Sequence, residues 1–565
     1  MKRYIKKTIS IASLVLLFGT TSCVNDLDVN PIDPNYVEAT PEALFTKCYA
    51  TIAAAGNGGA DGDSDVDGID GGTSGYYRQM WNAQVLTSDE AICGWGDEGI
   101  SDFVYNTYDA SHPMLRGYYY RLYTAITFCN EYLQDYEDYD PTMTAEIRFL
   151  RAFHYFNLMD GYGDVPFVTT ISSEKPQQIS RAELFDFVES ELLELEPNLS
   201  EAKAKKSSDA NYGRVDKAAA WLLLARLYLN AEVYTGTAQW AKAAEYAKKV
   251  MDSDYKLLTT GQDVWTAYQM LFMGDNGETD AAYEIIFPLL QDGQRTTSWG
   301  TSLYLIAGTF KNDMKEDPRQ DGLDLTGWYT KEKALTLKPD GEVNEYDEQA
   351  RSTNGTTEGW EGSRARADLV KKFFPDGDAP IGLHGYEMYQ VAGDDCALFN
   401  SIGRTLENEE FGVFTSGFGV TKFTNYKVDG SAGSDPQHPD MDTPVMRKAE
   451  AYLIYAEATA HTNNGVATSE GVNALKELRL RAHAEVKTSY TLDEILDEWS
   501  RELYFEGHRR MALIRNNKFG GNVGYNWAWK GGVLEGRDIP AERNLFAIPT
   551  TDLVANSNLV QNPGY

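Results

Sequence analysis

Flat aromatic side chains in loop-like segments are the residues of this chain best suited to bind a ligand. The 565-residue sequence contains 11 Trp and 35 Tyr. An indole face packs against the apolar C–H face of a sugar, while nearby polar groups bind its hydroxyls. Such rings also fill protein cores, so the pattern leaves both roles open. Several of these rings lie in segments without helical periodicity: Tyr76, Tyr77, Trp95, Trp299, Trp328 and Trp360.

The acidic residues suggest two other kinds of chemistry. A glycoside hydrolase needs only two carboxylates at a suitable separation, but 85 acidic residues make this requirement undiscriminating. Asp440 and Asp442 form a candidate calcium cluster, because calcium prefers carboxylate oxygens. The sequence contains no H-E-x-x-H, no G-x-S-x-G and no phosphate-binding G-x-x-x-x-G-K-[ST] motif. It therefore gives no support for an enzyme.

The N-terminus has the pattern of a secretory signal that ends at a cysteine. Four basic residues precede an apolar run from Ile9 to Phe18, which is too short to cross a hydrocarbon core of about 30 Å as a helix. Small residues then lead to Cys23, which looks like the cysteine of a bacterial lipobox. We therefore predict that residues 1–22 are a cleaved signal peptide and that a lipid on Cys23 anchors the protein. An ordinary signal with an incidental cysteine is the alternative.

Charge and cysteine content narrow the class of protein further. The chain has 51 basic and 85 acidic residues, a net charge of −34, and no basic patch. Such a field repels phosphate backbones, so we expect no nucleic-acid partner. The remaining cysteines lack metal-binding spacing, and their disulfide state stays open. They are Cys48, Cys93, Cys129 and Cys396.

Helical signals dominate the first half of the chain. A helix is expected over residues 140–162, and a capping box at Ser180 opens another. Asp216 is expected to cap a helix through Leu229, and Thr237 its successor through Met251. This last pair resembles a tetratricopeptide hairpin.

A second helical block lies near the C-terminus. Helices are expected over residues 444–461, 469–483 and 491–515, the last one opened by a capping box at Thr491. Residues 260–443 are rich in Gly, Asp and aromatics, with strand-like runs such as 285–290. The pattern predicts an all-α scaffold with long irregular insertions, and such insertions usually carry function.

Several segments of the chain resemble the RagB/SusD family of Bacteroidetes outer-membrane glycan-binding lipoproteins, and most of all its starch-binding member. The resemblance covers nearly the whole chain from Cys23 to Tyr565. It is carried by residues 146–152 (EIRFLRA), 163–166 (GDVP), 217–223 (KAAAWLL), 447–452 (RKAEAY), 456–458 (AEA), 502–510 (ELYFEGHRR), 548–549 (IP) and 561–565 (QNPGY).

This resemblance implies a non-enzymatic protein that is lipid-anchored on the outer face of the outer membrane. It would capture α-glucan oligosaccharides of the starch type and deliver them to a SusC-like TonB-dependent transporter, with no cofactor required. It also implies one domain over residues 23–565. Tetratricopeptide-like helices would form the scaffold at about residues 40–256 and 444–518, and the insertions at about 56–112 and 260–443 would form the binding face.

The resemblance also assigns ligand-binding residues. Arg78 matches the family's sugar-binding arginine, Trp95 its main stacking tryptophan, Trp299 a stacking tyrosine and Trp360 the tryptophan that completes the aromatic arc. Glu98 falls where a sugar-binding asparagine is expected.

The chain departs from the family's pattern at several positions, so the resemblance does not identify which glycan is bound. Cys93 replaces a second tryptophan, and an insertion of about 35 residues, Lys311 to Gly355, precedes Trp360. An α-1,6-glucan such as dextran and another glycan are therefore alternatives, and a surface glycoside hydrolase is a weaker one. The family's calcium position is partly matched by Asp440, Asp442 and Asp275, but Gly277 stands where an acidic ligand is expected.

Overall fold

The computed structural model describes residues 40–56, 66–262, 265–311, 314 and 354–565. Contacts divide the chain into residues 1–44 and residues 45–565. The described residues of the first unit begin helix α2 (Pro41–Ala53), where the Thr40 hydroxyl accepts a hydrogen bond from the N–H of Ala43. All other elements belong to the second unit. Among the described residues, no helix has the length and apolar character needed to cross a membrane.

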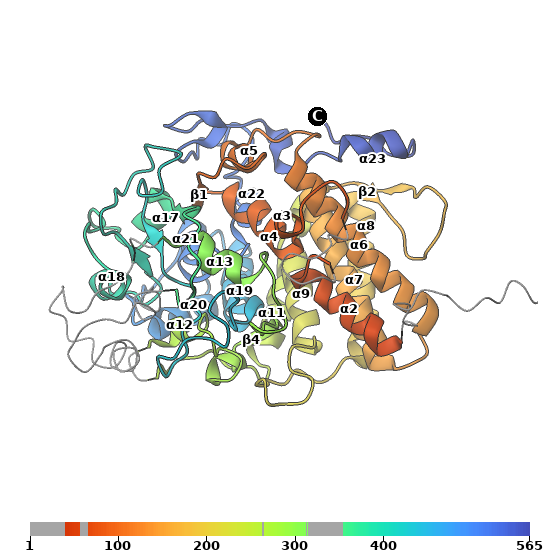
Figure 1. Ribbon diagram of the computed structural model, residues 1–565, viewed down its shortest axis with the longest axis horizontal. Coiled ribbons are helices and arrows are strands. Elements are labelled where there is room, and N and C mark those ends of the chain that lie inside the picture. Colours follow the sequence, from red (N-terminus) through yellow and green to blue (C-terminus); the bar gives the residue numbers. More distant parts are fainter. Residues whose placement is uncertain (1–39, 57–65, 263–264, 312–313, 315–353) are drawn as a thin grey trace, which may run out of the picture. The chain divides into compact units, whose positions relative to one another are not determined.

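Long helices form the scaffold of the second unit (Figure 1). Helix α6 packs on α7, α7 packs on α8, and α11 packs against both α9 and α19. The structure is therefore helix-rich, as the sequence predicts. The scaffold helices are α6 (Pro113–Tyr136), α7 (Pro141–Tyr162), α8 (Arg181–Leu195), α9 (Lys217–Leu229), α11 (Trp240–Met251), α19 (Lys448–His461), α20 (Ser469–Arg481), α21 (Leu492–Leu503) and α22 (Arg509–Arg515).

Local capping signals predict several of these helix starts correctly. The Asp140 carboxylate accepts the N–H groups of residues 142 and 143 at the start of α7, and Asp216 caps α9 in the same way. Ser180 and Thr491 form complete capping boxes with the glutamates three residues later. Each cap satisfies N–H groups that have no partner within the helix.

Tertiary pairing changes two other predicted helices. Residues 443–447 form strand β8 (Thr443–Arg447), which pairs with β4 (Ile285–Leu289), so α19 starts at Lys448 instead of Pro444. The helix predicted over residues 491–515 is interrupted between α21 and α22, where Phe505 and Gly507 have φ values of 63° and 84°. Such left-handed backbone cannot continue an α-helix.

The pair predicted at residues 216–251 also differs in detail. A short helix, α10 (Ala231–Thr235), follows α9, and Gln239 occupies the N-cap of α11 without a side-chain cap. The prediction that Thr237 caps this helix is therefore wrong. Its hydrogen bonds join the preceding turn, because the Thr237 N–H donates to the hydroxyl of Thr235.

Small antiparallel sheets accompany the helices, so the structure is not purely helical. Within the described ranges each sheet has two strands, and the pairs are β1–β5, β2–β3, β4–β8 and β6–β7. Their other bounds are β1 (Ala91–Cys93), β2 (Val165–Pro166), β3 (Gln178–Ile179), β5 (Ser363–Ala365), β6 (Phe399–Asn400) and β7 (Gly419–Val420).

Short helical turns connect these elements. They are α3 (Gly71–Ser74), α4 (Tyr76–Trp81), η1 (Asn82–Leu86), α5 (Ile100–Tyr105), η2 (Glu196–Asn198), α12 (Ala267–Met270), η3 (Asp280–Tyr283), α13 (Ser302–Gly308), α17 (Ala367–Lys371), α18 (Gly385–Ala392), η5 (Lys530–Gly532), η6 (Ala541–Asn544) and α23 (Thr550–Ala555).

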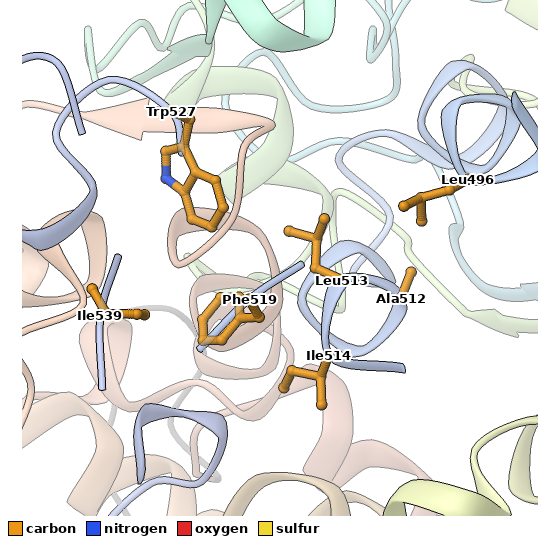
Figure 2. Close-up of a cluster of buried hydrophobic side chains, with 7 residues drawn as sticks. All are labelled: Leu496, Ala512, Leu513, Ile514, Phe519, Trp527 and Ile539. Carbon is orange, nitrogen blue, oxygen red and sulfur yellow. The ribbon is translucent and has the colours of Figure 1, made fainter. Parts of the chain in front are cut away.

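The C-terminal segment completes one part of the core. Phe519, Trp527 and Ile539 come from irregular chain after α22 and lie on one side of that helix (Figure 2). Their apolar side chains cover Leu513, which is fully buried. Burial of this surface holds a segment without long helices of its own against the scaffold.

Buried ionic groups join distant parts of the second unit. The Arg447 guanidinium donates to the carboxylates of Glu506 and Glu284, at 2.7 and 3.0 Å, and also to Glu502. Arg481 pairs with Glu284 and Glu502, and Lys422 pairs with Glu506. We call these six residues the Arg447 cluster. All are almost completely buried, so each charge depends on its partners.

Removal of Arg447 should therefore destabilise the fold strongly. Arg447→Ala leaves buried glutamates without a counter-charge, and we expect a loss of about 3–5 kcal/mol in the free energy of unfolding. Urea denaturation followed by circular dichroism measures this loss. The control Arg295→Ala removes an arginine whose side chain is 85% exposed, and should change stability by less than about 0.5 kcal/mol. Equal effects of the two substitutions would contradict the assigned role.

The cluster also predicts a particular dependence of stability on pH. Burial raises the pKa of Glu506, but the charges of Arg447 and Lys422 outweigh burial and hold the pKa at about 2. An unfolded glutamate titrates near 4.3, so Glu506 stabilises the fold above that pH and loses this effect as the pH falls towards 2. The urea midpoint should therefore drop between about pH 4.5 and 2. Arg447→Ala should make this drop shallower, and an unchanged slope would contradict the prediction.

Candidate functional site

One pocket in the second unit gathers aromatic, acidic and guanidinium side chains. Its volume is about 450 Å³. Four of the five residues predicted to bind ligand meet here: Arg78, Trp95, Trp299 and Trp360. The full lining is Asp70, Gly72, Thr73, Arg78, Trp95, Asp97, Trp299, Glu358 and Trp360. The pocket therefore combines segments that lie up to about 290 residues apart in the sequence.

Arg78 is held on the short helix α4 and is largely buried. Its Nη1 donates to the carbonyl of Gly72 at 3.1 Å. The guanidinium carbon lies 4.8 Å from the ring centroid of Tyr304 and 5.7 Å from that of Trp95. Cation–π attraction and the hydrogen bond therefore fix its orientation at one wall of the pocket.

The β1–β5 ladder brings Trp95 and Trp360 together. Cys93 pairs with Ser363, so the residues just after β1 and just before β5 lie side by side. The Trp95 indole Nε1 donates to the Trp360 carbonyl at 2.8 Å, and the ring centroids are 6.3 Å apart at 54°. Gly362 lies beneath the Trp95 ring, because an added Cβ would come within 2.3 Å of Cζ2.

Trp299 extends the aromatic surface from the segment before α13. The backbones at Gly75 and Gly300 approach so closely that a Cβ on Gly75 would lie 3.3 Å from the Gly300 Cα. This approach sets Trp299 beside Trp360, with ring centroids 6.0 Å apart and planes at 51°. Trp299, Trp360 and Trp95 are each half-buried and form a bent series that we call the tryptophan strip.

Carboxylates outnumber cations in the pocket lining. Among the described lining residues, Asp70, Asp97 and Glu358 are carboxylates, and Arg78 is the one cationic side chain. Asp70 accepts the N–H groups of Gly72 and residue 73 and thereby caps the short helix α3. Carboxylate oxygens accept hydrogen bonds from hydroxyl groups. The pocket therefore suits an uncharged, hydroxyl-rich ligand better than an anionic one.

The structure places the remaining sequence-predicted residues elsewhere. Glu98 is exposed and does not line the pocket, whereas its neighbour Asp97 does. The chain turns at this point, with the N–H of Ile100 donating to the Asp97 carbonyl, so successive side chains point in different directions. Tyr76 and Tyr77 are buried in the core. Cys23 and Trp328 lie outside the described residues.

Sequence reasoning missed five lining residues: Asp70, Gly72, Thr73, Asp97 and Glu358. Two of them stood next to recognised positions, since Asp97 precedes Glu98 and Glu358 lies two residues before Trp360. The acidic type of these two residues carries no signal in a chain with 85 acidic residues. Only their place within two residues of a pocket tryptophan could have identified them.

The predicted calcium ligands are held by protein donors. Asp442 accepts hydrogen bonds from the Tyr212 hydroxyl and the N–H of Gln291, at 2.7 and 2.8 Å. Asp440 accepts the N–H of Gly293, and Asp275 accepts that of residue 428. In the part of the chain that the structure describes, no group of three or more His, Cys, Asp or Glu residues could hold a metal ion. Calcium binding at these residues therefore stays an untested prediction.

The four described cysteines are buried and carry free thiols: Cys48, Cys93, Cys129 and Cys396. Cys93 belongs to β1, where burial raises the pKa of its thiol to about 11. It therefore supports the wall below Trp95 and does not enter the pocket lining.

Comparison with known families identifies the class of protein. A family model described as "SusD family" matches residues 378–565, and one described as "Starch-binding associating with outer membrane" matches residues 76–229. The second match contains Arg78 and Trp95, and the first contains the Arg447 cluster residues from Lys422 onward.

Full-length relatives agree with these matches. The chain is 37% identical to the starch-binding protein SusD of Bacteroides thetaiotaomicron, over 100% of this chain and 99% of the relative. It is 25% identical to the SusD-like protein P2 of Formosa agariphila, over 100% of both chains. The protein therefore belongs to the SusD family, whose members are outer-membrane-associated glycan-binding proteins and not enzymes.

Solved structures show the same fold. A SusD superfamily protein from Parabacteroides distasonis has a TM-score of 0.63 at 19% identity, and the match covers 94% of this chain and 100% of that one. A laminarin-binding SusD-like protein has a TM-score of 0.58 at 20% identity, with coverage of 94% and 100%.

The close approach at Gly362 provides a test of the tryptophan strip. Gly362→Ala should push the Trp95 ring out of place and break its bond to Trp360, because the new Cβ overlaps the indole. Fluorine NMR of fluorotryptophan-labelled protein should then show a shifted Trp95 resonance, assigned through Trp95→Phe. The control Gly96→Ala adds a Cβ with no atom within 4 Å and should leave that resonance in place. Identical spectra for the Gly362 variant and the unmodified protein would refute the geometry.

Proposed function

We propose that this protein captures α-glucan oligosaccharides of the starch type in the pocket and delivers them to a SusC-like TonB-dependent transporter. The tryptophan strip carries the proposal, because three half-buried indoles form a bent surface about as long as a few sugar rings. The 37% identity to a starch-binding protein supports the choice of ligand.

Capture combines ring stacking with recognition of hydroxyls. Each indole that stacks on a glucose ring contributes roughly 1 kcal/mol beyond burial. Arg78 donates to hydroxyl oxygens, and the carboxylates of Asp70 and Asp97 accept from hydroxyl hydrogens. After the cost of ordering a flexible chain, short oligosaccharides should bind with a Kd on the order of 0.1–1 mM. Longer chains bind better on a cell surface, because a released segment rebinds before it diffuses away.

An α-1,6-glucan such as dextran is the main alternative to an α-1,4-glucan as ligand. Ring planes at 54° and 51° favour a chain that curves, as α-1,4-linked glucose does. The alternative is favoured by the departures at Cys93 and Glu98, and by the insertion before Trp360. A solved relative in fold is a laminarin-binding protein, so another glycan is the third candidate.

The remaining parts of the proposal concern location. A lipid on Cys23 would anchor the protein to the outer membrane, with the pocket exposed at the cell surface. Hairpins such as α6–α7 and α9–α11 would act as a tetratricopeptide-like scaffold that faces the transporter. No cofactor is required for capture, since stacking and hydrogen bonding suffice.

Loss of the Trp95 ring, at one end of the tryptophan strip, should abolish most of the binding. Trp95→Ala removes one stacking surface and the bond that supports Trp360, so we expect affinity to fall about tenfold or more while helical circular dichroism stays unchanged. Isothermal titration with maltoheptaose, isomaltooligosaccharides, levan and xylan oligosaccharides measures the effect and ranks the ligands.

The matched control is Trp240→Ala, which removes a scaffold tryptophan stacked on His461 at 4.0 Å. It should leave the affinity unchanged. Unaltered binding in Trp95→Ala, or no binding of any glucan by the unmodified protein, would contradict the proposed function.

A further inference from the structure

Trp360, in the middle of the tryptophan strip, is held by an acidic side chain. Its indole Nε1 donates to Glu358 Oε2 at 2.8 Å, and the second oxygen, Oε1, accepts from Gln437 Nε2 at 2.9 Å. A hydrogen bond to a carboxylate is shorter and stronger than one between neutral groups. The plane of the Trp360 ring therefore depends on where Glu358 is held.

The backbone of Glu358 is itself fixed by a compact turn. Its carbonyl accepts from Asn354 Nδ2 at 2.8 Å, and its N–H donates to the Thr356 hydroxyl at 3.2 Å. The neighbouring Thr357 N–H donates to the carbonyl of Pro436 at 2.8 Å. Glu358 thus cannot move without the segment that contains Gln437.

The same segment also contacts Trp299. We call residues 434–440 the brace. His438 lies 5.2 Å from the Trp299 ring, centroid to centroid, at 57°. The Asp435 carboxylate accepts the N–H groups of Gln437 and His438, which holds these two side chains in a fixed relation. Asp440 accepts the N–H of Gly293, on the chain that leads to Trp299.

We propose that Glu358 is a positioning residue of the pocket, which fixes the plane of Trp360 and, through the brace, its angle to Trp299. Trp360 and Trp299, which lie on separate segments, then form one surface with a fixed curvature. Because that curvature must match the bend between successive sugar rings, Glu358 becomes a determinant of which glucan linkage is accepted. This inference rests on the proposed function for its ligand, but not for the ring geometry.

Ring geometry can be tested without any ligand. Glu358→Ala removes the acceptor, so fluorine NMR of fluorotryptophan-labelled protein should show a shifted and broadened Trp360 resonance, assigned through Trp360→Phe. Glu358→Gln keeps an oxygen acceptor for the indole and should restore the position of the resonance. The control Glu361→Ala removes an exposed carboxylate near the same ring, one paired with Lys311, and should have no effect. An unshifted resonance in Glu358→Ala would overturn the proposal even if glucans bind.

Binding then distinguishes positioning from direct contact. Glu358→Ala should weaken maltoheptaose binding about tenfold and change the ratio of maltoheptaose to isomaltoheptaose affinity, and Glu358→Gln should recover most of the loss. In a Trp360→Ala background the same substitution should have no further effect, since Glu358 acts through that ring. Additive losses in the double variant would mean that Glu358 touches the sugar itself, and would refute the positioning role.

Failure of this inference and failure of the proposed function give different results. If no glucan binds the unmodified protein but the Trp360 resonance responds to Glu358→Ala and not to Glu361→Ala, the ring geometry stands and the ligand is wrong. If glucans bind and the resonance does not respond, the ligand stands and the role of Glu358 is wrong.

Discussion

The fold depends on a guanidinium that has no contact with bulk water. Every N–H of Arg447 has an acceptor: two carboxylate oxygens of Glu506, one each of Glu284 and Glu502, and the carbonyl of Glu502. Burying such a group is unfavourable unless all its donors are satisfied. Its partners are Glu284 just before β4, Glu502 near the end of α21, and Glu506 between α21 and α22. The cluster therefore forms only when these segments have already met.

The Arg447 cluster is connected to the pocket through the two-stranded sheet β4–β8. Arg447 ends β8, and β8 pairs with β4, whose chain continues towards Trp299. The N–H of Gln291, just after β4, donates to Asp442, just before β8. A second sheet, β1–β5, places Trp95 and Trp360 side by side. The helices thus form most of the scaffold. The strand pairs β4–β8 and β1–β5 determine the positions of the three tryptophan rings.

Acidic side chains have quite different tasks in this chain, and residue type does not distinguish them. Glu506 neutralises a buried cation, Asp216 caps a helix, and Asp440 accepts backbone N–H groups of Gly293 and Ser434. Glu358 binds the indole of Trp360. Each role follows from which donors surround the carboxylate: sequence neighbours for Asp216, and distant segments for Glu506 and Asp440.

The sequence by itself determined the features that depend on neighbours within one turn. The caps at Asp140, Ser180 and Thr491 involve residues two or three positions apart, so their helix starts could be predicted. Motif resemblance added the family and four residues of the pocket lining. The sequence did not determine β1 and β5, because three-residue strands have no measurable periodicity.

Only the tertiary structure decided how the site is built. The hydrogen bond between Trp95 and Trp360 joins residues 265 positions apart, and the bond between Glu358 and Gln437 joins residues 79 apart. The turn at Asp97 selected that residue for the pocket instead of Glu98. Contacts of this kind exist only once the chain is folded, because each side chain is oriented by backbone pairing that no local sequence pattern encodes.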